Sequence, residues 1–267
     1  MFKDLYNSIE SIIAYCLPEK MGVITPYEKR MFAKGGVREY RLANKETDTL
    51  LIEKVEKISR AAGYKQTPKL FIYKSPHQNA GSMYNGSILI STAAIENETE
   101  KEIEATLAHE ITHKLHRRTK ILNTLTLTSL SLLGAGYITH KTYKYLKLNK
   151  PDKPILHILS IAALFSFFGN LTDKILTIPE RAMQRILEKD ADRGAAILTG
   201  DADAVLSHLK DLKEKYGDEE YEKRSDNILT ELRRTHPHYD ERISYIEKVK
   251  KEIEEKGIKN LSPTKFF

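Results

Sequence analysis

Two histidines spaced four residues apart, with a glutamate between them, are the residues of this chain best suited to chemistry. They lie in the segment His109-Glu110-Ile111-Thr112-His113. Residues four apart on a helix share one face, with Cβ atoms about 5–6 Å apart, so both imidazoles could reach one zinc ion. Glu110 would point to one side of the metal, where it could hold the attacking water as general base. Such a short motif also arises by chance, so the surrounding elements have to support it.

A catalytic zinc site needs a third protein ligand and one position open to water. The best candidate is Glu188, in the segment Glu188-Lys189-Asp190-Ala191-Asp192. Asp192 lies four residues later on the same helical face, where its carboxylate could accept the free ring N–H of a ligating histidine. Most acidic pairs of this kind form a solvated helix face, and composition alone favours that interpretation.

The histidine motif has to lie on a helix, and the sequence predicts one from Thr99 to about Arg118. The stretch Thr99-Glu100-Lys101-Glu102 has the form of a capping box, in which the hydroxyl and the carboxylate satisfy free backbone donors. Apolar side chains continue the helix: Ile103, Ala105, Leu107, Ala108, Ile111 and Leu115. The motif therefore falls in the middle of a capped helix.

Two short strands are predicted ahead of this helix, at residues 70–73 and 87–92. The stretch from Asn79 to Gly86 is rich in Asn and Gly and predicts a turn. We expect the two strands to form a small antiparallel sheet. An amphipathic helix is predicted before them, from about Lys45 to Ala62.

Further helices are predicted in the second half of the chain. Thr177 and Pro179 are typical of an N-cap and first turn, and open a helix that Gly200 ends. Residues 204–255 predict helices that are broken at Gly217 and at His236-Pro237.

Two segments without Lys, Arg, Asp or Glu lie between the two candidate metal-binding helices. They run from Ile121 to Thr139 and from Pro154 to Thr172. As helices, each would be roughly 28 Å long, close to the hydrocarbon thickness of a bilayer. A membrane-inserted helical hairpin is one interpretation, and a pair of buried soluble helices is the other. The basic residues flanking the segments slightly favour a catalytic side that faces the cytoplasm.

Composition limits the other possibilities. The chain has 267 residues, a net charge of +6 and a single cysteine, Cys16. One cysteine excludes an internal disulfide and a cysteine-rich zinc site, so zinc would need histidine and carboxylate ligands. The basic surface could attract nucleic acid or an anionic membrane, but no nucleic-acid motif accompanies the lysines, and no nucleic-acid partner is expected.

Four stretches, in a fixed order, resemble the HtpX-type zinc metallopeptidases, the family that also contains the CAAX prenyl proteases. Asn79-Ala80 with Ile88-Leu89-Ile90-Ser91-Thr92 is similar to the family's loop and edge strand, and Ala108–His113 to its zinc helix. Arg185-x-x-Glu188-x-x-Ala191-Asp192-x-Gly194-Ala195 is similar to its third-ligand helix, and Thr235-His236-Pro237 with Arg242-Ile243 to a late segment. These stretches frame residues 67–118 and 178–250. The match is specific, because unrelated proteins with the histidine motif share only the second stretch.

The resemblance implies a role for each matching residue. His109, His113 and Glu188 would bind one Zn²⁺ per chain, and Asp192 would support a ligating histidine. His236 would lie beside the metal, where it stabilises the oxyanion or caps the zinc in a resting state, and Arg242 would organise that segment. The alternative for His236 is a surface turn residue.

The resemblance also implies where the substrate binds. An extended polypeptide would pair with the edge strand, and its binding residues would be Asn79, Ala80, Ile88, Leu89 and Ile90.

We therefore expect an α+β, mainly helical fold, with a zincin-like metallopeptidase core, a small antiparallel sheet and an inserted hydrophobic helical hairpin. The expected parts are an N-terminal helical region (1–66), a catalytic domain (67–120 and 177–260) and the hairpin (121–176). The expected function is a zinc-dependent endopeptidase of membrane-associated protein quality control, with its catalytic domain on the cytoplasmic side. The alternatives are a non-catalytic, zinc-stabilised membrane chaperone or adaptor, and a soluble peptidase whose hairpin is buried. The sequence does not indicate the physiological substrate or the oligomeric state.

Overall fold

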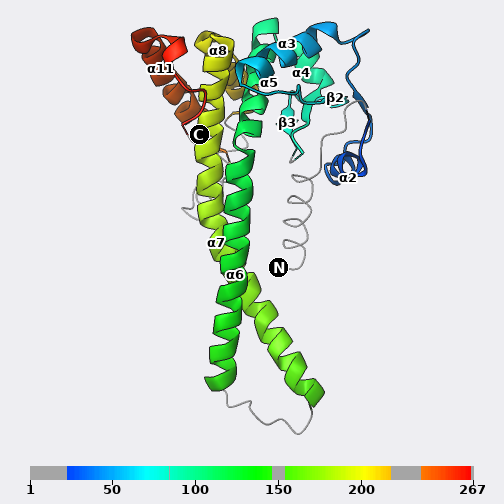
Figure 1. Cartoon of the computed structure of the whole chain (residues 1–267), viewed down its shortest axis with the longest axis vertical. Helices are drawn as coiled ribbons and strands as arrows, with labels where there is room; N and C mark the ends of the chain where they lie inside the picture. The colour runs from blue at the N-terminus through cyan, green and yellow to red at the C-terminus, as the bar shows by residue number, and fades with distance from the viewer. Residues whose placement is uncertain (1–22, 84, 146–153, 218–235, 266–267) are drawn as a thin grey trace.

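The fold is α+β and mainly helical, as the sequence predicts, with one small sheet (Figure 1). The computed structural model describes residues 23–83, 85–145, 154–217 and 236–265. Its elements are α2 (Pro26–Lys34), β1 (Tyr40–Leu42), α3 (Thr49–Ala61), β2 (Leu70–Tyr73), β3 (Ala80–Ser82), β4 (Ile88–Ser91), α4 (Thr92–Asn97), α5 (Glu100–Leu115), α6 (Arg117–Tyr145), α7 (Pro154–Thr199), α8 (Ala202–Tyr216), α11 (Tyr239–Lys256) and a 3₁₀ turn, η1 (Ile258–Asn260).

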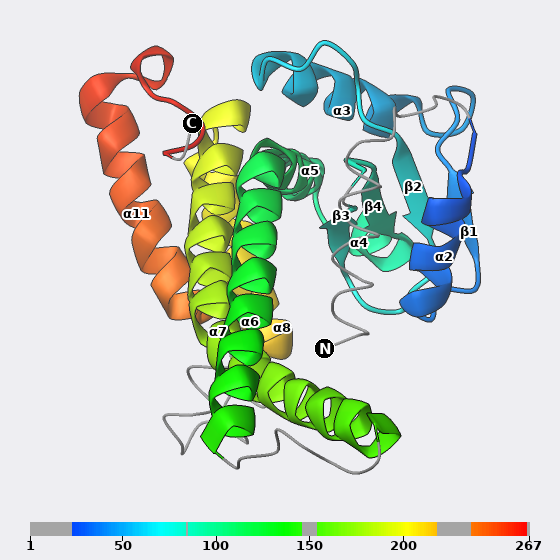
Figure 2. The same cartoon turned by 60° about the horizontal axis from the view of Figure 1, so that its bottom comes forward.

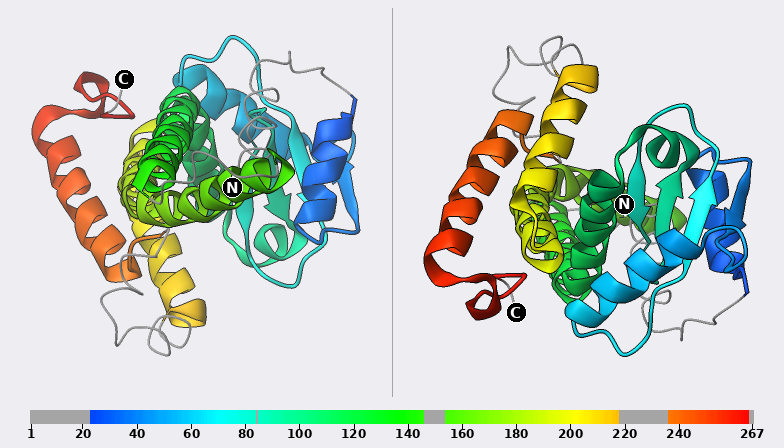
Figure 3. Two further views of the ribbon diagram at one scale, coloured as in Figure 1. Left: turned by 90° about the horizontal axis from the view of Figure 1, so that it is seen from below. Right: turned by 90° about the horizontal axis from the view of Figure 1, so that it is seen from above.

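Helix α5 lies at the centre of the molecule. The sheet flanks it on one side and α7 and α8 on the other, while α11 packs outside α7 and α8 (Figures 2 and 3). The predicted capping box is present at the start of α5. The Thr99 side chain accepts a hydrogen bond from the backbone N–H of Glu102, and the Glu102 carboxylate accepts one from the backbone N–H of Thr99. The histidine motif therefore lies on a capped and packed helix, which confirms that part of the sequence analysis.

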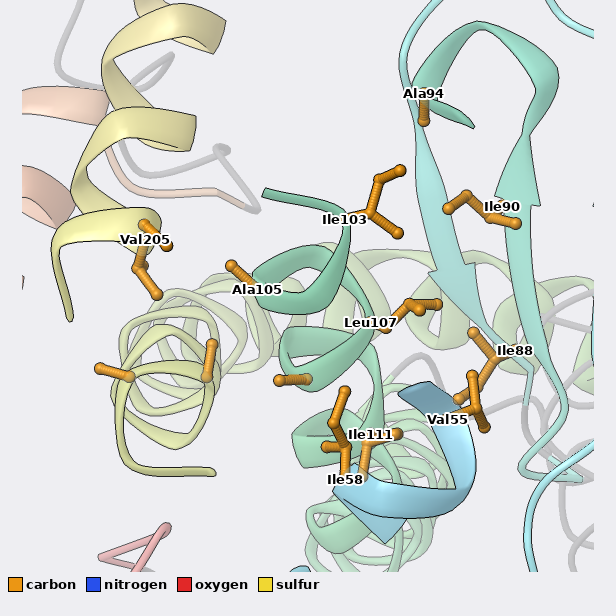
Figure 4. Packing of buried hydrophobic residues seen from close by; sticks show 14 of the residues in the cluster. Val55, Ile58, Ile88, Ile90, Ala94, Ile103, Ala105, Leu107, Ile111 and Val205 are labelled. Carbon is orange, nitrogen blue, oxygen red and sulfur yellow. The ribbon is translucent and has the colours of Figure 1, made fainter. Parts of the chain in front are cut away.

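The core around α5 has two sides. Ile103 and Leu107 face Ile90 and Ile88 of β4, while Ala105 is turned toward α8 (Figure 4). A second cluster covers the opposite face of the sheet: Tyr27 and Phe32 of α2, Phe71 and Tyr73 of β2, and Met83 after β3. Both faces of the sheet are thus covered by apolar side chains. Helix α5 is held between the apolar side chains of β4 and those of α8.

The sheet differs from the predicted antiparallel pair. It is mixed, in the order β1-β2-β4-β3, with β4 parallel to β2 and antiparallel to β3. The prediction missed β3 because Ala80, Gly81 and Ser82 have little intrinsic strand preference. The chain passes through β3 and a turn at Gly86, with φ of +92°, before it returns as β4 beside β2.

Two predictions therefore need correction. Residues 88–91 are not the edge strand, because β4 is paired on both sides and β3 forms the edge. Residues 1–66 are not a separate helical region either. Residues 1–22 lie outside the described part, β1 pairs with β2, and α3 packs against α5.

Helix α7 is continuous from Pro154 to Thr199, with Pro179 inside it. The prediction of a helix that begins at Pro179 is therefore wrong, although Gly200 does end it, with φ of +74°. An interior proline removes one hydrogen bond of a helix, and α7 continues through Pro179 despite that loss. One helix thus carries both the predicted hydrophobic segment and Glu188, so no boundary separates the hairpin from the catalytic domain at residue 176.

Helices α6 and α7 pack against each other as a long pair that extends away from the sheet, and the N-terminal part of α7 then turns aside (Figure 1). Large apolar side chains are exposed along this pair: Leu122, Leu125, Leu130, Leu133, Tyr137, Leu159, Ile161, Phe167 and Leu171. Among the described residues, however, no helix reaches the combination of length and mean hydropathy that a membrane span requires. The prediction of two spanning segments is not supported.

The close approach of α5 and α7 depends on Gly194. A Cβ built there would lie 2.2 Å from Thr112 Oγ1 and 2.8 Å from Thr112 Cβ. We expect Gly194→Ala to destabilise the protein by about 1–3 kcal/mol, because Thr112 is fully buried and the helices would have to separate. Urea denaturation would measure this, with Gly136→Ala on α6 as the control, because a Cβ there has no neighbour closer than 3.9 Å. A Gly194→Ala variant as stable as the Gly136→Ala variant would contradict this packing.

Candidate metal centre

The structure brings His109, His113 and Glu188 together, although α5 and α7 are far apart in the sequence. Their ligand atoms all lie within 4.8 Å of one another. Glu188 Oε1 lies 3.0 Å from His113 Nε2, and Glu188 Oε2 lies 3.6 Å from His109 Nε2. The histidine rings are nearly perpendicular, with centroids 4.6 Å apart. Two imidazoles and one carboxylate around a common point are a donor set that zinc prefers, so the residues fit the metal.

Asp192 lies behind the cluster, as predicted. Its Oδ1 lies 2.8 Å from His109 Nδ1, which leaves Nε2 of that ring directed toward Glu188. Burial raises the pKa of Asp192, but the Arg242 guanidinium and His109 lower it overall to about 2. A buried carboxylate in this position fixes the ring orientation and tautomer of His109 and raises its basicity.

Arg242 holds Asp192 from the other side. Its Nε and one terminal nitrogen each donate a 2.7 Å hydrogen bond to the carboxylate. Asp192 Oδ1 thus lies between two donors, and the chain His109–Asp192–Arg242 links α5, α7 and α11. Asp190 lies between Glu188 and Asp192 in the sequence but does not join the cluster. Its Oδ2 lies 2.8 Å from His116 Nε2 instead.

We expect Arg242→Met to destabilise the protein by about 3–5 kcal/mol, because it leaves the buried Asp192 charge without its main partner. Chemical denaturation at neutral pH would measure the change. Lys250→Met is a matched control on the same helix, since Lys250 pairs with Asp203 on the surface and should leave stability close to wild type. Equal stabilities for the two variants would show that Asp192 does not need its guanidinium partner.

His236 lies beside the cluster. Its Nδ1 is 3.2 Å from Glu188 Oε2, and its side chain is 57% exposed. Arg242, which belongs to the same late segment in the sequence analysis, has a side chain that is only 12% exposed. The segment therefore carries one solvent-facing imidazole and one largely covered guanidinium. His236 also lines the cavity that contains the cluster.

Glu110 is buried, with 7% of its surface exposed. It lines the same cavity as His109, His113 and Glu188. Glu110 thus lines the cavity without belonging to the cluster of three candidate ligands.

The cluster opens into a cavity of about 720 Å³. Asn79, Ala80, Gly81 and Ser82 line one side of it, and α8 lines the other. Of the five residues predicted to bind substrate, Asn79 and Ala80 therefore reach the cavity. Ile88 and Ile90 are fully buried in the core, and Leu89 is half-buried beside Gly81, so these three are structural.

The cavity also contains a polar group that the sequence did not predict: Glu98, Thr106 and His208. Thr106 gave a usable signal, because it precedes His109 by three residues and so shares its helical face. Glu98 lies just before the helix, and His208 comes from α8, so no local pattern connects them.

Comparison with known proteins places the chain among peptidases. Residues 45–250 match the model of peptidase family M48. The protease HtpX homologues of Moorella thermoacetica and Bacillus subtilis are 27% identical over 210 residues and 28% identical over 217 residues. These matches cover 71% and 74% of this chain, and 68% of each relative. The protease HtpX of Shewanella putrefaciens is 28% identical over 165 residues, which cover 58% of this chain and 55% of that protein. The chain thus spans between about half and two thirds of the length of these relatives.

Proposed function

The chain belongs to peptidase family M48, and we propose that it is a zinc-dependent endopeptidase that cleaves extended polypeptides within a zincin-like core. The observation that carries this proposal is the convergence of Glu188 with His109 and His113 at one wall of an open cavity. A solvated acidic face, the alternative for Glu188, does not account for a side chain that is only 12% exposed and lies between two histidines.

Each residue of the site has a place in peptide hydrolysis. Zinc, when bound by the three ligands, supplies Lewis-acid activation of water and of the scissile carbonyl. Glu110 takes the proton of the attacking water as general base and then delivers it to the leaving amine. His236 turns its exposed imidazole to the oxyanion of the tetrahedral intermediate and donates a hydrogen bond to it. Asp192 and Arg242 keep His109 oriented throughout.

The substrate pairs with β3 in this proposal, and not with β4. Within the described residues, β3 has a partner strand on one side only, and Ala80–Ser82 faces the cavity. An extended peptide can add a strand to such an edge through backbone hydrogen bonds, which makes binding tolerant of sequence. Gly81 leaves space beside the backbone for a close approach.

Hydrolysis of an unfolded model protein tests this function. With the purified full-length chain and zinc, we expect fragmentation of unfolded casein that stops with a chelator and returns when zinc is added. The rival function is a non-catalytic, zinc-stabilised membrane chaperone or adaptor. It would bind zinc and suppress aggregation of the same protein without producing fragments, and that result would replace the peptidase proposal.

We also propose that the α6–α7 pair contacts a membrane, with the catalytic side toward the cytoplasm, in a role in quality control of membrane or misfolded proteins. The support is the row of exposed apolar side chains, which water solvates poorly. Carbonate extraction and vesicle flotation test it. Release into the supernatant together with no flotation would favour the alternative, a soluble peptidase in which another protein surface covers the pair.

A further inference from the structure

A buried polar group lies one helical turn from the metal-binding histidines. Thr106 precedes His109 by three residues, which corresponds to about 4.5 Å along the helix axis. Its hydroxyl donates a 2.9 Å hydrogen bond to Glu98 Oε2 and lies 3.3 Å from His208 Nε2. All three residues line the cavity that contains the metal ligands. A substrate that crosses the cluster therefore places a neighbouring side chain over this group.

We propose that Glu98, Thr106 and His208 form the floor of a subsite that selects a lysine or arginine side chain next to the scissile bond. This inference rests on the proposed peptidase function and deepens it, by naming the substrate class that the cavity prefers.

The Glu98 carboxylate is poorly compensated within the described residues. Its side chain is 2% exposed, and the one hydrogen bond that it accepts comes from Thr106. His208 Nδ1, at 3.9 Å, is beyond hydrogen-bond distance and is buried with no partner among the described residues. Burial raises the pKa of Glu98 to about 7 and lowers that of His208 to about 4. A carboxylate held in this way gains most from a ligand that brings a positive charge.

The charges around the floor favour a cation. Glu102 on α5 and Asp211 on α8 both raise the pKa of Glu98, while Lys215 acts in the opposite direction. Lys215 does not reach the floor, because its ammonium is bonded to Asp211 and to Gln78. His208 is neutral at physiological pH. With its pKa raised to about 7 by burial, Glu98 is about half ionised at neutral pH, and a cation placed beside it would hold it in the charged form.

The walls suit the stem of a long basic side chain. Apolar and aromatic side chains from α5 and α8 line the cavity that contains both the metal ligands and Glu98: Ala105, Val205, Leu209, Leu212 and Tyr216. Lysine and arginine bury their methylene groups against such surfaces while their charged ends pair with an acid. A purely structural role explains the group less well, since a buried, weakly bonded carboxylate costs stability.

Binding to an inactive chain tests the subsite independently of hydrolysis. The zinc-loaded Glu110→Gln protein is mixed with fluorescent peptides that differ at one central position, which holds lysine, arginine, norleucine or glutamate. Fluorescence polarisation should show the basic peptides binding at least about tenfold more tightly than the norleucine peptide. Adding Glu98→Gln should reduce this ratio to within about twofold. The amide can still accept from Thr106, and the loss of a buried charge should not lower the melting temperature.

Glu104→Gln is the matched control, since it makes the same change of Glu to Gln on α5, six residues after Glu98, at a pair with the exposed Lys57. It should leave the ratio unchanged. Equal binding of basic and norleucine peptides, or a preference that survives Glu98→Gln, overturns the subsite. Digestion of a mixed peptide library by the active chain separates the two proposals. Cleavage without enrichment of lysine or arginine beside the cut would remove only the subsite. No cleavage, with charge-dependent binding intact, would remove only the peptidase.

Discussion

Glu110→Gln is expected to reduce peptide hydrolysis by roughly 10³-fold or more while leaving metal binding intact. The amide has nearly the shape of the carboxylate but cannot accept the proton of the attacking water. Glu110 lines the cavity without belonging to the three-ligand cluster, so its replacement removes a proton acceptor and no ligand. Initial rates with a quenched fluorescent peptide, alongside metal analysis of the same samples, measure both properties.

Glu104→Gln is again the control for a charge change on α5, because Glu104 pairs with Lys54 and Lys57 away from the cavity. Its hydrolysis rate should match that of the wild type. A folded Glu110→Gln protein that retains full activity would remove the general-base mechanism. A variant that loses its metal instead would place Glu110 among the ligands.

Glu188→Ala is expected to weaken zinc binding by at least about 100-fold. Changes to groups that only support a ligand already cost about 10- to 100-fold in affinity, so removing a ligand should cost more. Two histidines alone would remain, and two neutral ligands hold a divalent cation poorly. Competition with a chromogenic chelator measures the affinity. Asp203→Ala removes a carboxylate from a surface ion pair on α8 and should leave affinity unchanged.

Asp192→Asn provides a graded comparison with Glu188→Ala. Asp192 contacts His109 and not the metal position, so its loss should weaken zinc binding less than the loss of Glu188. An affinity for Glu188→Ala equal to that of Asp192→Asn would mean that Glu188 only supports the site.

The parts of the site that follow from local rules could be predicted from the sequence. The capping box of Thr99 and the four-residue spacing of the histidines act within one helix, and both are present. Glu188 could not be placed by such rules, because its contact with His113 joins two helices 75 residues apart in the sequence. The resemblance to known metallopeptidases supplied that link.

The remaining errors have physical causes in tertiary packing. Pro179 has the local character of a helix start, but it lies inside one continuous α7, a helix that packs against both α5 and α6. Residues 88–91 have the strongest strand pattern near the site because β4 is buried between two strands, whereas the edge strand β3 is built from small residues. A hydrophobic pattern thus identifies the interior of a sheet more readily than its edge. Glu98 and His208 meet only in the folded chain.

Zinc content of the wild type and of Glu188→Ala, purified side by side, shows whether α5 and α7 close around a metal ion. We expect one zinc ion per chain in the wild type and almost none in the variant, with both proteins folded by circular dichroism. Equal zinc content in the two proteins, or a folded wild type that takes up no zinc from a zinc-supplemented buffer, would contradict it.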